Sequence, residues 1–230
     1  MKIFIAGGTS GIGLAVARKY LEQGHEVGVC GRSQEKIDAI EKHEKLKIYR
    51  LDIYDKLSFE TAVKDFSKGE LDIMIASAGS YSNSRTRRLT QDEAVNMLKV
   101  NISGTLNAFE IAREIMLKNG KGHLAAISSV AALLEYSGAS VYSKSKRVVI
   151  NLCEAYREAL SDFGIGVTAV IPGYIDTLKL RELNNNDVSK KPFIMTEEYA
   201  ADIVIKSIEE NRDKIIFPKK MKIAVSILSM

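Results

Sequence analysis

The sequence predicts an α/β fold in which a doubly wound parallel sheet of about seven strands carries helices on both faces. Two observations support this prediction. Short apolar runs alternate along the chain with longer segments of helical periodicity. The apolar runs are hydrophobic throughout, which is typical of parallel strands buried on both faces. In such a sheet, right-handed crossovers leave a ligand crevice at the carboxyl ends of the strands.

The predicted elements follow one another with short connections. Strands are expected at 3–6, 26–30, 47–51, 71–76, 123–128, 166–171 and 214–217. Helices are expected near 14–21, 34–42, 56–67, 91–118, 140–162 and 196–210. No internal repeat or low-complexity linker interrupts this order, so residues 1–230 are expected to form a single domain. The polar segment 179–191 is expected to be a lid or binding loop, because long unpatterned loops are uncommon in compact domains.

The composition is that of an ordinary globular protein, with 46% hydrophobic and 27% charged residues among 230. The net charge is +4, but Lys and Arg are scattered among 29 acidic residues, which disfavours a nucleic-acid-binding surface. Cys30 and Cys153 lie far apart among apolar neighbours and are expected to be buried, reduced thiols. The three histidines share no ligand spacing, so no metal site is expected.

The two ends of the chain favour a cytoplasmic protein. Met1 and Lys2 lead directly into the first predicted strand, so no signal peptide is expected. No apolar run approaches the roughly 18 residues of a transmembrane helix. The apolar segment 221–230 is expected to pack on the protein or on a partner subunit. The start of a membrane-surface helix is the alternative for this segment.

A cluster of glycines follows the first predicted strand. Gly7, Gly11 and Gly13 have the spacing G-x-x-x-G-x-G and lead into the first helix. Glycine permits positive φ angles and a close approach of the backbone to a ligand. The free N–H groups and the dipole at a helix N-terminus favour a phosphate group. The position of these glycines therefore indicates a dinucleotide site, with a plain tight turn as the alternative.

The end of the second predicted strand indicates which dinucleotide binds. An NAD-binding protein places an acidic residue there, about 20 residues after the glycines, to bind the ribose hydroxyls. This sequence has Gly31 and Arg32 instead. A guanidinium group suits a 2′-phosphate, and Gly31 is expected to leave room for that phosphate. NADP(H) is therefore favoured over NAD(H). The alternative is that Arg32 is only an exposed loop cation.

A tyrosine and a lysine stand four residues apart on a predicted helix. The side chains of Tyr142 and Lys146 therefore share one face of that helix. A phenol with a pKa near 10 is a poor base at neutral pH, and a cation within about 4–6 Å lowers that pKa. Lys146, together with an oxidised nicotinamide, is expected to provide this field for Tyr142. Such pairs are also common on solvated helices, so the spacing alone is weak evidence.

With these residues in place, the chain resembles the single-domain short-chain dehydrogenases/reductases from Lys2 to about Phe217. The family motif T-G-x-x-x-G-x-G is matched by residues 6–13, with Ala6 in place of the Thr. The active-site motif Y-x-x-x-K is matched by residues 142–146, and the P-G motif after the sixth strand by residues 172–177.

Three further residues match single positions of the family. The catalytic Ser is assigned to Ser129, which lies 13 residues before Tyr142, the usual separation in the family. Ser128 then belongs to the end of the strand. The helix Asn of the family matches Asn101, and the Asp beside the adenine matches Asp52.

The resemblance implies a Rossmann-like oxidoreductase that moves a hydride between NADP(H) and an alcohol or carbonyl substrate. It implies that Tyr142 is the general acid/base and that Ser129 orients the carbonyl oxygen. Lys146 would hold the nicotinamide ribose and tune Tyr142, and Asn101 would keep a water in a proton relay. Cofactor contacts are assigned to Gly7, Thr9, Ser10, Gly11, Ile12, Gly13, Arg32, Asp52, Ala78, Gly79, Tyr142, Lys146, Pro172, Gly173, Ile175 and Thr177.

The sequence departs from the family after the fourth predicted strand. The family motif N-N-A-G reads Ala76-Ser77-Ala78-Gly79 here, so both Asn residues are missing. In the family those residues stabilise the sheet and the adenosine side of the cofactor. Their loss therefore puts local hydrogen bonding in doubt more than the chemistry. The absent Thr at Ala6 concerns the same region, and the two changes are expected to compensate each other.

Two other functions stay open. The first is a non-catalytic NADP(H) sensor or scaffold on the same fold, although such branches commonly lose the Tyr or the Lys that are present here. The second is an epimerase or dehydratase of the longer branch, which carries a larger carboxyl-terminal substrate domain than the roughly 50 residues left after Thr177.

The substrate itself is not indicated by the sequence. Its pocket is expected to be shaped by the lid 178–193 and the loop 80–88. The arginines at 85, 87 and 88 in that loop either attract an anionic substrate or form a solvated loop. The family usually associates through its long helices. A homodimer or homotetramer is therefore expected through 91–118 and 140–162.

Overall fold

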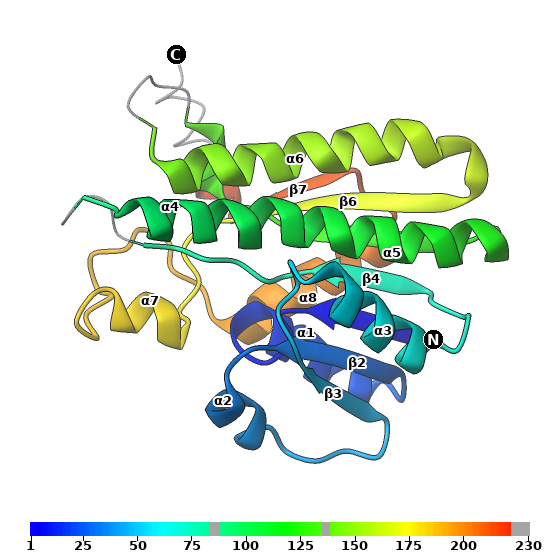
Figure 1. Cartoon of the computed structure of the whole chain (residues 1–230). Helices are drawn as coiled ribbons and strands as arrows, with labels where there is room; N and C mark the ends of the chain where they lie inside the picture. Colours follow the sequence, from blue (N-terminus) through cyan, green and yellow to red (C-terminus); the bar gives the residue numbers. More distant parts are fainter. Residues whose placement is uncertain (83–87, 135–138, 222–230) are drawn as a thin grey trace.

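The computed structural model describes residues 1–82, 88–134 and 139–221. Its centre is a seven-stranded parallel sheet with the strand order β3-β2-β1-β4-β5-β6-β7 (Figure 1). Every expected strand is present within two residues of its predicted bounds, and the doubly wound parallel fold is confirmed. The strands are β1 (Lys2–Ala6), β2 (Glu26–Gly31), β3 (Leu46–Arg50), β4 (Ile73–Ala76), β5 (Gly122–Ile127), β6 (Ile165–Pro172) and β7 (Lys214–Phe217).

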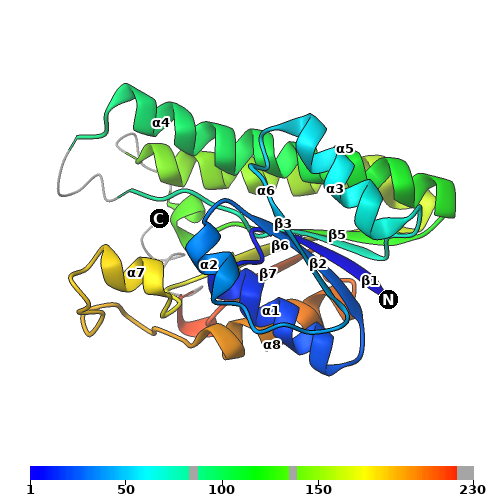
Figure 2. The same ribbon diagram turned by 60° about the horizontal axis from the view of Figure 1, so that its bottom comes forward.

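Helices cover both faces of this sheet (Figure 2). One face carries α1 (Gly11–Glu22) and α8 (Glu197–Glu209), which pack against each other, and the short α2 (Gln34–Asp38) contacts β3. The other face carries α3 (Lys56–Ser67), α4 (Gln91–Leu98), α5 (Gly104–Asn119) and α6 (Val141–Leu160). The short helix α7 (Leu178–Glu182) lies apart from both layers, beyond the carboxyl ends of the strands (Figure 1).

Alternate residues of the central strands build two separate cores. Phe4 and Met74 face the core beneath α3, α5 and α6, whereas Ile3, Ile5 and Ile75 face the core beneath α1 and α8. Burying a side chain of this size contributes about 1.5–3 kcal/mol relative to leaving it in water. Because both faces are covered, the strands read as uninterrupted apolar runs, which is the pattern that the sequence shows.

The long helical region expected over 91–118 is helical throughout, but it is not one regular α-helix. A wide π-helical turn, η1 (Lys99–Ser103), separates α4 from α5. The turn brings Asn101 fully inside the protein, where its amide group finds partners on two other segments. Such local widening of a helix is frequent at functional sites.

The predicted lid is also more ordered than an unpatterned loop. It contains α7, whose first turn is capped by the Thr177 hydroxyl, which accepts a hydrogen bond of 3.1 Å from the Leu180 N–H. Arg181 then forms a two-pronged ion pair with Asp176, with both N–O distances at 2.6 Å. These contacts supply the local stability that the sequence pattern does not show, and they tie the start of the lid to the end of β6.

Several smaller expectations can be compared with the structure. Cys30 and Cys153 are free and buried, as predicted. The helix expected at 34–42 is shorter and ends at Asp38. Among the described residues, no helix is long and apolar enough to cross a membrane. The arginines at 85 and 87 and the tail 222–230 lie outside the described residues, whereas Met221 is buried.

Candidate active site

The carboxyl ends of six strands open into one cavity of about 1120 Å³. Its walls come from the segments that follow β1 to β6, together with α7 and the lid. The cavity crosses the point between β1 and β4 where the order of the strands reverses, which is where doubly wound sheets bind ligands. Pockets for drug-sized ligands reach about 1000 Å³. A dinucleotide and a small substrate can therefore share this cavity.

The glycine loop approaches the sheet so closely that side chains are excluded. Gly7 has a φ of +82°, and an added Cβ would lie 2.5 Å from the backbone of Ala78. An added Cβ at Gly13 would lie 2.5 Å from the Gly7 carbonyl oxygen. The sequence-predicted loop Gly7–Gly13 thus sits at the floor of the cavity, which Gly7, Thr9, Ser10, Gly11 and Ile12 line directly.

The start of α1 differs from the start of the neighbouring helices. Ser10 stands at its N-cap position but makes no side-chain capping bond. In α2, α3, α4, α6, α7 and α8 a Ser, Thr or Asp hydroxyl or carboxylate accepts the capping bond. The N–H groups at the start of α1 therefore have no side-chain acceptor at the wall of the cavity. This arrangement suits a diphosphate.

At the β2 end of the cavity, Arg32 lies beside Asp52. The Arg32 NH1 nitrogen is 3.2 Å from Asp52 Oδ2, and the two side chains are 55% and 20% exposed. Lys36 of α2 lines the same end of the cavity, and its ammonium group has no ion-pair partner among the described residues. The two residues that the sequence assigned to the 2′-phosphate and the adenine, Arg32 and Asp52, are thus brought together as an ion pair.

The expected role of Gly31 was wrong. An added Cβ at this position would lie 2.1 Å from Thr9 Oγ1 and 2.8 Å from Thr9 Cγ2. The space beside Gly31 is therefore filled by the Thr9 side chain and is not left open for a phosphate. Sequence spacing does not reveal this contact, because the two residues follow different strands.

The missing family asparagines leave no break in the backbone bonding at the end of β4. The Ala6 carbonyl oxygen accepts hydrogen bonds from the Ser77 and Ala78 N–H groups, both at 2.8 Å. Gly79 follows, and a Cβ added there would lie 3.2 Å from Lys146 Nζ. The main chain thus ties this segment to β1 and leaves Gly79 open toward the catalytic lysine predicted above.

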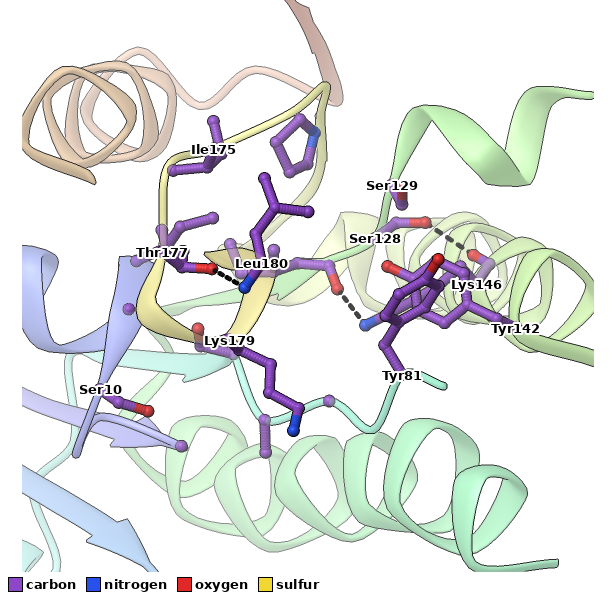
Figure 3. Close-up of a pocket in the computed structure, with 18 of the residues that line it drawn as sticks. Ser10, Tyr81, Ser128, Ser129, Tyr142, Lys146, Ile175, Thr177, Lys179 and Leu180 are labelled. Atoms are coloured by element: carbon purple, nitrogen blue, oxygen red, sulfur yellow. Dashed lines mark hydrogen bonds between the residues drawn. The ribbon is translucent and has the colours of Figure 1, made fainter. Parts of the chain in front are cut away.

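Ser128 and Ser129 point to different places at the end of β5 (Figure 3). The buried Ser128 hydroxyl donates a 2.7 Å hydrogen bond to the Lys146 carbonyl oxygen, which fixes β5 to α6. The Ser129 hydroxyl accepts a 3.2 Å bond from the Ala131 N–H and is also hydrogen-bonded to Tyr142. The structure therefore places Ser129, and not Ser128, beside the predicted acid/base, as the 13-residue spacing predicts.

The pair Tyr142 and Lys146 stands on the first two turns of α6. Ser140 caps this helix by accepting a 3.1 Å bond from the Ser143 N–H. Lys146 is 4% exposed, and its Nζ donates a 2.8 Å hydrogen bond to the Ile127 carbonyl oxygen. The helix register thus brings the phenol and the ammonium group to one wall of the cavity, beside the end of β5.

Burial controls the proton affinity of both groups. Burial raises the pKa of the half-buried Tyr142 to about 12, although its hydrogen bond with Ser129 acts in the opposite direction. Burial also lowers the pKa of Lys146 to about 8. The Lys146 cation was expected, together with an oxidised nicotinamide, to lower the pKa of Tyr142. In the protein without cofactor, burial dominates and the pKa of Tyr142 is raised.

Asn101 connects two parts of the site. Its Oδ1 accepts a 2.7 Å bond from the Ser80 N–H, and its Nδ2 donates to the Ser80 carbonyl at 3.1 Å and to Ser145 Oγ at 2.9 Å. The Ser145 hydroxyl in turn donates to the Tyr142 carbonyl at 2.8 Å. Asn101 therefore holds the segment after β4 against α6. Its role in a water relay stays a prediction.

Tyr81 belongs to the loop 80–88 that was expected to shape the pocket, and its ring lies against Tyr142. The two ring centroids are 4.7 Å apart at an interplanar angle of 75°, and both rings line the cavity (Figure 3). Asn101 fixes the neighbouring Ser80 by two hydrogen bonds, so the position of Tyr81 follows from the same clamp. The sequence places Tyr81 shortly after Gly79 at a strand end, but its contact with Tyr142 has no sequence signature.

The remaining predicted cofactor residues form the wall after β6. The Gly173 N–H donates a 2.8 Å bond to the Phe217 carbonyl oxygen, which ties this wall to β7. Ile175 forms an isolated bridge with Met195 at the far end of the lid. Pro172, Gly173, Ile175 and Thr177 all line the cavity. The hydroxyl of Thr177 is engaged in capping α7.

Known proteins resemble this chain in sequence and in fold. The family described as short chain dehydrogenase matches residues 1–188. An uncharacterized oxidoreductase of Staphylococcus aureus (strain MW2) is 31% identical over 191 residues, which cover 81% of this chain and 83% of that protein.

Two solved structures share the fold. The closed form of a serine dehydrogenase complexed with NADP+ is 22% identical, with a TM-score of 0.83 over 94% of both chains. The structure of ElxO with NADP bound is 24% identical, with a TM-score of 0.82 over 94% of this chain and 96% of that one. The match to the family over most of the chain, together with the relative, decides the classification: the chain belongs to the short chain dehydrogenase family of oxidoreductases.

Proposed function

We propose that the protein is an NADP(H)-dependent dehydrogenase/reductase that interconverts alcohol and carbonyl groups. One observation carries this proposal. Ser129, Tyr142 and Lys146 meet at the wall of the same cavity whose floor is the glycine loop. A hydroxyl donor, a transferable proton and a buried cation therefore lie within one space that is large enough for a dinucleotide.

The residues of the cavity suit NADP(H). The loop Gly7–Gly13 and the uncapped start of α1 would hold the diphosphate. Arg32 and Lys36 would bind the 2′-phosphate at the β2 end, where an NAD-binding protein needs a carboxylate. The nearby Asp52 is already paired with Arg32. The NADP that two structural neighbours contain is consistent with this choice.

The reaction follows from the side chains around Tyr142. When bound, the nicotinamide supplies or accepts the hydride. Ser129 donates a hydrogen bond to the substrate oxygen and stabilises the negative charge that develops there. Tyr142 gives its proton to the same oxygen. Lys146 binds the ribose hydroxyls with its ammonium group, which lies beside Gly79 and the Ile127 carbonyl.

The protonation of Tyr142 favours reduction. Because burial raises its pKa to about 12, the phenol keeps its proton at neutral pH. A neutral phenol is the form that a proton donor needs, whereas alcohol oxidation needs the phenolate. Without cofactor, Tyr142 is therefore in the protonation state that carbonyl reduction needs.

The experiment combines turnover with binding. NADPH oxidation is measured with a panel of aldehydes and ketones, and NADPH affinity is measured by calorimetry. Tyr142→Phe is expected to lower kcat by about 10²–10⁴-fold while leaving NADPH affinity nearly intact, because it removes only the phenolic hydroxyl with its transferable proton. NADPH binding without turnover of any carbonyl compound would identify a sensor. Undiminished turnover in a folded Tyr142→Phe variant would remove Tyr142 from the mechanism.

A further inference from the structure

One part of the cavity wall is formed by the segment after β6 and by the lid, and we call it the second part of the cavity. Its apolar lining includes Leu180, Leu183 and Phe193. Its polar lining consists of hydroxyl groups, an amide and lysines, and no acidic residue that the structure describes lines this part. Asp52 is the one acidic side chain on the described cavity wall, and it lies at the opposite, β2 end. The second part of the cavity therefore has apolar walls and a net positive charge from its lysines.

Most of the cations on the described wall already have a partner. Arg32 pairs with Asp52, Lys179 pairs with Glu182 at 3.3 Å, and Lys146 donates to the Ile127 carbonyl. Lys36 lies on α2 at the cofactor end. Lys191 remains, and it makes no ion pair within the described part of the chain.

The structure holds Lys191 in place without neutralising it. Its Nζ lies 5.5 Å from the centroid of the Tyr174 ring, and Tyr174 follows Gly173 at the end of β6. The Lys191 N–H donates a 3.0 Å bond to the Val188 carbonyl oxygen, and the side chain is half-buried. An aromatic ring orients an ammonium group but leaves its positive charge intact. A half-buried cation beside apolar side chains is strongly attracted to an anion, because few water molecules screen it.

We propose that Lys191 binds an acidic group of the substrate, so that the protein acts on carbonyl or alcohol compounds that carry a carboxylate. This inference rests on the proposed carbonyl reduction. The substrate places its carbonyl oxygen between Ser129 and Tyr142, its apolar body against the lid, and its carboxylate on the Lys191 ammonium. Tyr174 is the positioning residue for that ammonium group.

The test compares substrates that differ only in charge. Reduction of 4-carboxybenzaldehyde and of succinic semialdehyde is compared with reduction of their methyl esters. In the wild-type protein kcat/KM is expected to be about tenfold higher for each carboxylate, which corresponds to about 1.4 kcal/mol. Lys191→Met should abolish this difference by raising KM for the carboxylates alone. Lys191→Glu should reverse it, whereas Lys190→Met, at the exposed neighbouring lysine, should leave it unchanged.

A binding measurement separates this inference from the proposed function. Calorimetry with NADP+ present gives the affinities for 4-(hydroxymethyl)benzoate and for its methyl ester, whether or not either is oxidised. Tighter binding of the carboxylate that is lost in Lys191→Met and kept in Lys190→Met supports the inference, even if no aldehyde is reduced. Equal affinities for acid and ester, or equal losses in both lysine variants, would overturn the role of Lys191 while leaving carbonyl reduction in place.

Discussion

Replacing Arg32 by Ala tests how the protein selects NADPH over NADH. In the structure the guanidinium group already pairs with Asp52 at 3.2 Å, and the Arg32 side chain is 55% exposed. Partly exposed ion pairs contribute about 0.2–1 kcal/mol. A charge-assisted contact between Arg and a phosphate contributes about 1.5–3 kcal/mol. Exchanging Asp52 for the 2′-phosphate therefore leaves roughly 0.5–3 kcal/mol, or about a 2- to 150-fold preference for NADPH.

The carboxylate of Asp52 provides a matched second variant. Asp52→Asn keeps a hydrogen-bonding side chain but frees the guanidinium group and removes a negative charge near the phosphate. It should tighten NADPH binding by up to about fivefold, the equivalent of about 1 kcal/mol. Arg32→Ala should instead weaken NADPH and leave NADH nearly unchanged. The two variants are thus expected to shift the preference in opposite directions.

The assay uses fragments of the cofactor as well as the whole molecule. Calorimetry with 2′,5′-ADP and 5′-AMP isolates the contribution of the 2′-phosphate, and kcat/KM for NADPH and NADH shows whether it reaches turnover. Lys36→Ala reports the share of the second cation at this end of the cavity. If Arg32→Ala weakens both fragments equally, or Asp52→Asn weakens 2′,5′-ADP, then Arg32 does not bind the phosphate and the reasoning fails.

Three other predictions concern packing and protonation. Gly31→Ala should lower the free energy of unfolding by about 1–3 kcal/mol in urea titrations, because the new Cβ would lie 2.1 Å from Thr9 Oγ1. Adding Thr9→Ala to that variant should restore most of the lost stability. A Gly31→Ala variant as stable as the wild type would refute the contact. Burial lowers the pKa of His123 to about 4, and its Nε2 is hydrogen-bonded to Thr168. The unfolded chain takes up this proton near pH 6.5, so the free energy of unfolding should fall by up to about 3 kcal/mol as the pH drops from 6.5 to 4. His123→Gln should lack this loss, and an equal dependence of stability on pH in both proteins would contradict the prediction. Burial lowers the pKa of Lys146 to about 8, so its ammonium group loses its proton above that pH. The affinity for NADP+ should therefore decline above pH 8. The same decline in a Lys146→Met variant would show that Lys146 does not cause it.

The sequence alone predicted the strands of the sheet and which segments of the chain meet at the candidate site. Strands buried on both faces must be apolar throughout, so their positions are visible without any knowledge of tertiary contacts. Parallel strands also place all their carboxyl ends at one edge. We therefore expected three segments to meet: the residues after β1, the residues after β5, and the first turns of α6. Ser129, Tyr142 and Lys146 do line one cavity with the glycine loop.

What the sequence could not predict depends on contacts between side chains far apart in the chain. The turn around Asn101 has helical composition, and it widens where its buried amide bonds to Ser80 and Ser145. The Thr9 side chain fills the space beside Gly31 because two strand ends approach each other. The ring of Tyr81 lies on Tyr142 because a clamped backbone presents it. None of these contacts has a periodicity or a spacing that a single sequence displays.

The packing of Thr9 against Gly31 also constrains how this sequence can diverge. A side chain at position 31 is destabilising for as long as Thr9 keeps its hydroxyl and methyl group, since even a Cβ would lie 2.1 Å from the hydroxyl oxygen. A descendant that acquires an acidic residue there, and with it the ribose recognition of NAD-dependent proteins, loses less stability if position 9 has first changed to a smaller residue. The two positions therefore form an epistatic pair. The steric clash favours a change at position 9 before a change at position 31, in natural selection and in directed evolution alike.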